Sequence, residues 1–217
     1  KQAWADERKG DLAKPPPRSC TEIPRGFIEG GIQVCQCGDR VEIEDGIQVQ
    51  GLDHDDCPEP PATDEIKPGL VFLSPGPFTP SEQGVPKLVK AVVQRGLPLF
   101  GVCLGHQGIA EHFGAKLGTF DHPVHGKPSE VQHNDSGIFS GLPSPFTAGR
   151  YHSLYVQRET LPEALEVTAE TADGVIMGLR HKTLPIASVQ FHPESILTLK
   201  DRSGLRLLHK VLAELCP

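Results

Sequence analysis

The sequence has no apolar run long enough to cross a membrane, and its first residues carry no basic segment followed by an apolar one. These two absences predict a soluble, cytoplasmic protein that makes no contact with a membrane. Basic residues are not in excess either. The 21 Lys and Arg against 28 Asp and Glu give a net charge of −7, which argues against a nucleic-acid-binding surface.

Pairs of the form Cys-x-x-Cys, which open ordinary zinc sites, are also missing, although the chain has six cysteines. Their uneven spacing disfavours a disulfide framework, so we expect a reducing compartment. A weaker alternative is a metal site made by residues that are near one another in sequence: Cys20, Cys35, Cys37, His54 and Cys57. We therefore assign no metal ligand and expect no cofactor on this chain.

Residues 68–217 carry the pattern of a layered α/β domain. With 37% hydrophobic residues in 217, the chain can form a packed core of this class. Short buried-strand patterns alternate with amphipathic helical ones, which favours a doubly wound, mostly parallel sheet. The expected strands are 70–73, 98–102 and 184–191, and the expected helices are 85–95, 104–113 and 205–215.

Residues 1–67 are atypical for such a domain. The proline run within 11–18 is typical of a linker, and the prolines within 57–61 interrupt any regular element. Between them, 31–34, 41–43 and 46–49 alternate in the manner of strands, and we interpret them as edge strands. The alternative is a divergent region that leaves the sheet without its first βα unit.

A nucleophile is suggested by residues 101–107, Gly-Val-Cys-Leu-Gly-His-Gln. Cys103 follows an apolar strand and precedes a helix, and Gly101 and Gly105 give the small-residue spacing of a nucleophile elbow. A helix N-terminus favours thiolate over thiol, and the backbone N–H of Leu104 is placed to bond an oxyanion. An isolated cysteine is more often an inert core residue, but this context predicts an activated nucleophile.

A base is suggested by residues 190–194, Gln-Phe-His-Pro-Glu. They follow a buried-strand pattern, so His192 is expected at the carboxyl end of a strand, where open α/β sheets collect functional groups. His192 could take the thiol proton and return it to a leaving amine, while Glu194 fixes the imidazole tautomer.

Together these motifs resemble class I (triad) glutamine amidotransferases, and within that family most of all the glutaminase component of anthranilate synthase. The likeness covers roughly 68–217 through five motifs in order. They are Leu-Ser-Pro-Gly-Pro at 73–77, the cysteine segment at 101–107, His-Gly-Lys at 125–127, Arg-Tyr-His-Ser-Leu at 150–154 and the histidine segment at 190–195.

The resemblance implies glutamine hydrolysis through a glutamyl thioester, with Cys103, His192 and Glu194 as the triad. It implies an oxyanion hole made by the backbone N–H groups of Gly76 and Leu104. The substrate-binding residues that it implies are Gly76, Pro77, Phe78, Leu104, Gln107, Ser153 and Leu154. Phe78 departs from the family pattern, which has glycine there, and a bulky ring could narrow the pocket.

The same resemblance implies a partner. The ammonia would pass to a chorismate-binding synthase, as a separate subunit or a fused domain, and that synthase would use Mg²⁺. We interpret His125 and Lys127 as a loop that docks the synthase or as a solvated turn. Another ammonia acceptor, such as an aminodeoxychorismate, phenazine-pathway or GMP-type synthetase, remains an alternative, as does a non-catalytic docking module.

Overall fold

The computed structural model describes residues 32–37, 42–43, 47–52 and 68–216. The linker expected within 11–18 and the proline segment 57–61 lie outside the described residues. So do Cys20, His54 and Cys57 of the alternative metal site. Among the described residues, no helix is both long and apolar enough to cross a membrane.

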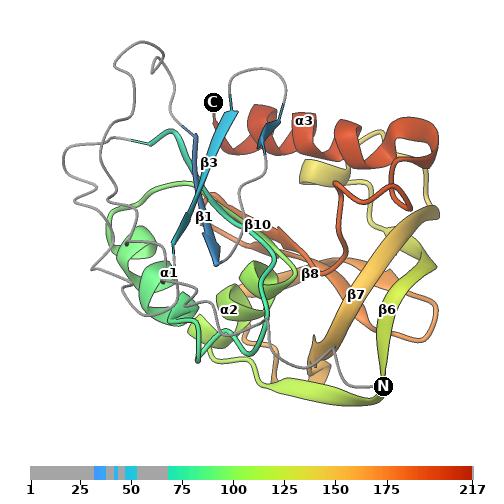
Figure 1. Cartoon of the computed structure of the whole chain (residues 1–217), viewed down its shortest axis with the longest axis horizontal. Coiled ribbons are helices and arrows are strands. Elements are labelled where there is room, and N and C mark those ends of the chain that lie inside the picture. Colours follow the sequence, from blue (N-terminus) through green and yellow to red (C-terminus); the bar gives the residue numbers. More distant parts are fainter. Residues whose placement is uncertain (1–31, 38–41, 44–46, 53–67, 217) are drawn as a thin grey trace, which may run out of the picture.

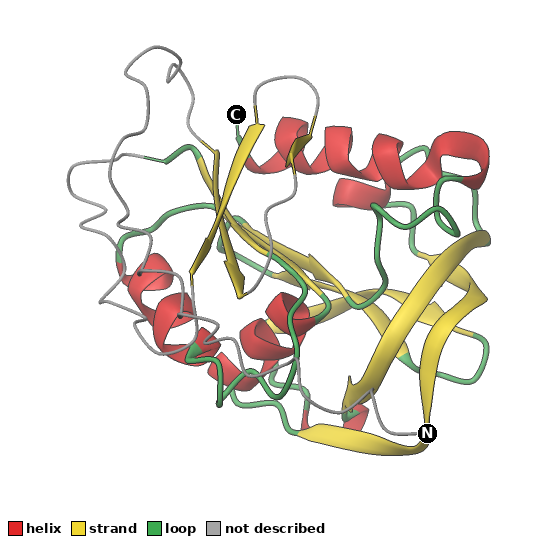
Figure 2. Ribbon diagram, in the orientation of Figure 1, coloured by secondary structure: helices red, strands yellow, loops and turns green. Residues whose placement is uncertain are grey.

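The described strands form one sheet in the order β2-β3-β1-β4-β5-β10-β9-β8-β6-β7, with helices on both faces (Figures 1 and 2). The strands are β1 (Ile32–Cys37), β2 (Glu42–Ile43), β3 (Ile47–Leu52), β4 (Leu70–Leu73), β5 (Leu99–Val102), β6 (Leu117–His133), β7 (Phe146–Val156), β8 (Leu165–Thr171), β9 (Ile176–His181) and β10 (Ile186–Val189). The helices are α1 (Val85–Gln94), α2 (Leu104–His112) and α3 (Ser203–Leu215), with short 3-10 helices η1 (Gly137–Phe139), η2 (Arg158–Thr160) and η3 (Lys200–Arg202).

The sheet has a parallel half and an antiparallel half. Strands β3, β1, β4, β5 and β10 pair in parallel, whereas β9, β8, β6 and β7 continue the sheet in antiparallel pairs. In the parallel half Gly101 is level with both Leu73 and Ser188. Strands β4, β5 and β10 therefore end at the same edge, which is where open α/β sheets place their functional groups.

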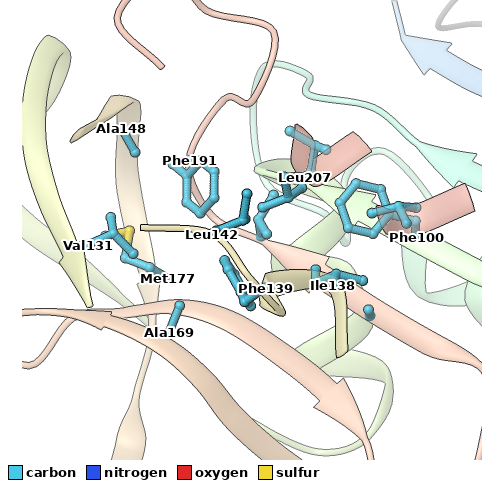
Figure 3. Packing of buried hydrophobic residues seen from close by; sticks show 14 of the residues in the cluster. Phe100, Val131, Ile138, Phe139, Leu142, Ala148, Ala169, Met177, Phe191 and Leu207 are labelled. Carbon is cyan, nitrogen blue, oxygen red and sulfur yellow. The ribbon is translucent and has the colours of Figure 1, made fainter. Parts of the chain in front are cut away.

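Alternation along the buried strands gives each face of the sheet its own core. Phe100 and Val189 face one side and pack with α3 and η1 around Phe139, Phe191 and Leu207 (Figure 3). The opposite side packs against α1 and α2 through Leu99 of β5 and Ile186 of β10, among others. The two covered faces explain why these short strands consist almost entirely of apolar residues.

The α/β class and the doubly wound arrangement of the parallel strands are confirmed. Helices α1 and α2 end near the predicted glycines, Gly96 and Gly114, both at positive φ. The edge-strand prediction for the N-terminal segment is wrong for β1, which lies between β3 and β4. Because β1 and β3 share the sheet with β4, they supply parallel strands ahead of residue 68. The boundary at 67/68 stays a prediction.

The loop predicted at His125 and Lys127 is also wrong. Both residues lie inside β6, paired with Tyr151 and Arg150 of β7. The register shifts between them, and Gly126 sits at φ 64, so the segment is a bulged strand and not a turn. Glycine and two flanking prolines mimic turn composition here, and pairing with β7 overrides it.

Candidate active site

Cys103 occupies the sharp junction between β5 and α2. Its backbone has φ 52 and ψ −98, a conformation that residues with a side chain rarely adopt. The Cys103 N–H donates to the carbonyl of Val189 in β10 at 2.9 Å, which ties the junction to the strand preceding His192. The residue is only 7% exposed. The strand-to-helix elbow predicted from the sequence is therefore present.

The two flanking glycines are required by close backbone contact. A Cβ atom on Gly101 would lie 2.6 Å from the carbonyl carbon of Gly105, and one on Gly105 would lie 2.5 Å from the carbonyl oxygen of Leu73. Real Cβ atoms do not approach backbone so closely. The glycines thus let the elbow pack directly against the end of β4.

That packing brings the loop after β4 to the elbow. Gly76 is half-buried in this loop, while Pro77 and Phe78 are exposed. Phe78 sits at φ 65, in the left-handed region that favours glycine, which gives a physical reason for glycine at this place. Leu104 is the first residue of α2, and its N–H belongs to a first helical turn that has no intrahelical acceptors.

His192 and Glu194 are held together at the opposite side of the elbow. The Nδ1 atom of His192 lies 2.7 Å from Oε1 of Glu194. Burial by itself would lower the pKa of His192, but hydrogen bonding and negative charge from Cys103 and Glu194 outweigh it and raise the pKa to about 9. The imidazole is therefore protonated at neutral pH. Its Nε2 is buried with no partner inside ordinary hydrogen-bond limits, although Cys103 is near enough to act on its charge.

The backbone of His192 is fixed by β7. Its N–H donates to the carbonyl of Gly149 at 3.0 Å, and its carbonyl accepts a hydrogen bond from the Thr198 hydroxyl at 2.6 Å. The same hydroxyl accepts from the Gly149 N–H at 2.9 Å. The Tyr151 ring stands edge-on to the imidazole at 4.9 Å between centroids. These contacts leave the imidazole little freedom to rotate away.

The predicted glutamine-binding residues of α2 and β7 also meet. Gln107 is buried, and its side-chain amide donates to the carbonyl of Leu154 at 3.2 Å and to Oε1 of Gln190 at 3.1 Å. Ser153 and Leu154 are half-buried on β7. One helix and one strand therefore converge beside the Cys103 elbow.

Sequence reasoning gives no role to the buried polar groups around these residues. Arg150 donates from Nε to Nε2 of His152 at 3.1 Å, and Nδ1 of His106 lies 3.0 Å from the Ser188 hydroxyl. Burial lowers the pKa of His152 to about 4 and that of His106 to about 3. The i, i+2 spacing of Arg150 and His152 is the signal that could have found them, because it puts both side chains on one face of a strand.

Comparison with known proteins gives relatives with one common name. The chain is 54% identical to anthranilate synthase component 2 of Pseudomonas aeruginosa, over 61% of this chain and 69% of that protein. It is 52% identical to anthranilate synthase of Azospirillum brasilense over 70% of this chain, yet it spans only 21% of that longer protein. Bifunctional protein TrpGD of Thermotoga maritima is 40% identical over 90% of this chain and 34% of its own length.

Solved structures share the fold at low sequence identity. A GMP synthase protein of Thermoplasma acidophilum matches with a TM-score of 0.68 and 24% identity, covering 87% of this chain and 96% of that one. The family profile described as Glutamine amidotransferase class-I matches residues 38–210. That match spans most of the chain, including the cysteine elbow and the His192 segment, so this chain belongs to the class I glutamine amidotransferases.

Proposed function

We propose that this chain hydrolyses glutamine through Cys103, His192 and Glu194 and supplies the ammonia to anthranilate synthase chemistry on chorismate. The observation that carries the proposal is the state of His192. A buried imidazole is held by Glu194 at 2.7 Å and keeps its proton, with a pKa of about 9, because Cys103 and Glu194 face it. A thiolate paired with an imidazolium is the activated form of a cysteine nucleophile.

The reaction follows from this pairing. The Cys103 sulfur attacks the side-chain amide carbon of glutamine, and the oxyanion accepts hydrogen bonds from the backbone N–H groups of Leu104 and Gly76. His192 gives its proton to the amide nitrogen as the carbon–nitrogen bond breaks, so ammonia leaves and a thioester remains. Neutral His192 then takes a proton from water, whose oxygen attacks the thioester. Glutamate leaves, and the proton on His192 restores the ion pair.

Glutamine binding is assigned to the two sides of the elbow. The backbone of Gly76, Pro77 and Phe78 would hold the amide end, and Gln107 with Ser153 and Leu154 would hold the amino-acid end. Each step uses only proton transfer, thiol addition and backbone hydrogen bonds, so the proposed reaction needs no cofactor on this chain. A requirement for Mg²⁺ is assigned to the partner synthase, and a cytoplasmic location is part of the same proposal.

The acceptor is proposed from the relatives. Anthranilate synthase component 2 proteins support a chorismate-binding synthase partner, and the Azospirillum and Thermotoga proteins show that related chains occur within longer proteins. A second acceptor is favoured by one relative, the aminodeoxychorismate/anthranilate synthase component 2 of Bacillus subtilis, which is 46% identical over 66% of this chain. Aminodeoxychorismate synthesis is therefore the alternative.

The first experiment labels the nucleophile. The purified chain is incubated with an electrophilic glutamine analogue, alone and with a candidate synthase, and its intact mass is measured. We expect one adduct, absent from Cys103→Ala. Labelling that persists in Cys103→Ala would contradict the assignment of the nucleophile. No adduct in either condition would favour a docking module without glutaminase activity.

Product analysis then separates the acceptors. The chain is mixed with either an anthranilate synthase or an aminodeoxychorismate synthase, each lacking its own glutaminase, and glutamine-dependent product formation is compared with ammonia-dependent formation. We expect glutamine to support anthranilate formation. Glutamine-dependent turnover that occurs only with the aminodeoxychorismate synthase would assign the alternative acceptor.

A further inference from the structure

The carbonyl of Leu154 is an unusual meeting point of two side chains. It accepts a hydrogen bond from the Gln107 amide at 3.2 Å and lies 2.7 Å from Nδ1 of His152. Both lone pairs of this oxygen are therefore used, which fixes the orientation of its peptide plane. Within the described sheet β7 is an edge strand, so its outer backbone groups can meet a ligand instead of another strand.

Arg150 dictates the tautomer of His152. A guanidinium has only donors, so Nε2 of His152 must accept the hydrogen bond from Nε of Arg150 at 3.1 Å. The ring hydrogen is then on Nδ1, which donates to the Leu154 carbonyl. Burial, together with the charges of Arg150 and His192, keeps the pKa of His152 near 4, against the hydrogen bond to Leu154 that raises it. The neutral tautomer therefore persists at neutral pH.

Arg150 itself is an expensive residue to bury. It is 5% exposed, and its Nη2 atom has no hydrogen-bond partner. Its guanidinium carbon lies 5.6 Å from the centre of the Phe120 ring, and its Nη1 donates to the Ser129 hydroxyl at 3.4 Å. No ion pair with a carboxylate is found for it within the described part of the chain. A residue needed only for packing would not carry this desolvation cost.

These contacts connect the two ends of the binding strand. Gly149, immediately before Arg150, holds the backbone of His192, and Leu154 at the other end is the predicted contact for glutamine. We infer that Arg150 and His152 are positioning residues that set the Leu154 backbone for the amino-acid end of glutamine, so that they govern glutamine affinity and leave the reactivity of Cys103 unchanged. This inference rests on the proposed glutaminase function.

The test compares two electrophiles on one set of variants. His152→Phe keeps a ring of similar size but removes both hydrogen bonds, whereas His152→Asn retains a side-chain N–H close to the place of Nδ1. Each variant is inactivated with an electrophilic glutamine analogue, which needs the amino-acid site, and with iodoacetamide, which needs only an accessible Cys103. His133→Phe on β6 is the matched control, because that histidine also lies close to a backbone carbonyl, at 2.9 Å.

For His152→Phe we expect inactivation by the glutamine analogue to slow about tenfold, the effect of one lost buried hydrogen bond, with the iodoacetamide rate unchanged. The glutamine KM should rise by about the same factor while kcat changes little, and His152→Asn should recover most of the loss. Arg150→Met should resemble His152→Phe. His133→Phe should match the wild type in both rates.

Two results would overturn the inference. Equal slowing by both reagents would mean that His152 supports the elbow or the fold in general, and unchanged rates with both would mean that the network does not set the site. A wild-type chain that reacts with iodoacetamide but never with the glutamine analogue would contradict the proposed function itself. The wild-type measurement therefore separates the two failures.

Discussion

The two halves of the sheet build the site by different means. In the parallel half, strands β5 and β10 are buried along their whole length, and the functional residues follow directly at their ends. In the antiparallel half, β6 has 17 residues of which only Gly118 and Val131 are buried. There the polar side chains of β7 turn inward and bond to one another. The first half places groups through backbone geometry, and the second through a buried polar network.

This difference predicts different sensitivities to substitution. A backbone contact has no way to relax, because the strands around it are themselves buried and paired. A side-chain network can lose one member and keep the fold, at a cost set by the groups left without partners. Changes in the parallel half should therefore act on folding, and changes in the antiparallel half on binding.

The largest effect is expected from Gly105→Ala in the parallel half. The new methyl group would lie 2.5 Å from the Leu73 carbonyl oxygen, and neither β4 nor α2 can move without breaking the core. We expect the free energy of unfolding to fall by about 3 kcal/mol or more, measured by urea denaturation.

Two alanine variants sharpen this first comparison. Gly69→Ala meets nothing within 4 Å and should be neutral, while Gly118→Ala in β6 meets the Tyr155 ring at 2.5 Å, a side chain that can move. A Gly118→Ala cost as large as that of Gly105→Ala would remove the distinction between the two halves.

An intermediate effect is expected from pH, because His192 links the halves. Its pKa is near 6.5 when unfolded and about 9 when folded, so its contribution is fully present below pH 6.5 and is lost as pH rises through about 9. Glu194 is 51% exposed, and solvent screening limits the contribution to at most about 3 kcal/mol. We expect the free energy of unfolding, measured by urea denaturation between pH 6 and pH 10, to decrease over this range.

Glu194→Gln tests the cause of that decrease. Removing the carboxylate charge should bring the pKa of His192 down and shrink the stability difference between pH 6 and pH 10. The matched variant is Glu166→Gln, whose carboxylate pairs with Arg180 and not with a histidine. If Glu194→Gln gave the same pH profile as the wild type, the raised pKa would not come from Glu194.

The same division explains what can be predicted from sequence. Strand β4 and the start of α2 lie at the residues that the sequence predicts, because short apolar runs ending in glycine loops have few other interpretations. Cys103, His192 and Glu194 stand out as candidates for the same reason, since each closely follows such a run. In contrast, β6 has no apolar face, and the turn-like composition around Gly126 conceals its pairing with β7. Only contact across the fold identifies Arg150 and His152 as partners of Leu154.

The smallest effect is expected at Phe78, the other residue of the parallel half whose side chain sits on a left-handed backbone near the site. Unlike Cys103, it is 66% exposed, and its φ of 65 favours glycine. Phe78→Gly relieves about 1 kcal/mol of backbone strain but gives the unfolded chain more freedom, so the free energy of unfolding should change by less than about 1 kcal/mol. We expect the glutamine KM to stay within about twofold of wild type, since the neighbouring loop binds through backbone atoms. A larger fall in KM would show that the ring narrows the pocket, and a larger rise would show that the ring itself holds the loop. Either result would place a side chain in control within the half of the sheet where backbone geometry otherwise decides.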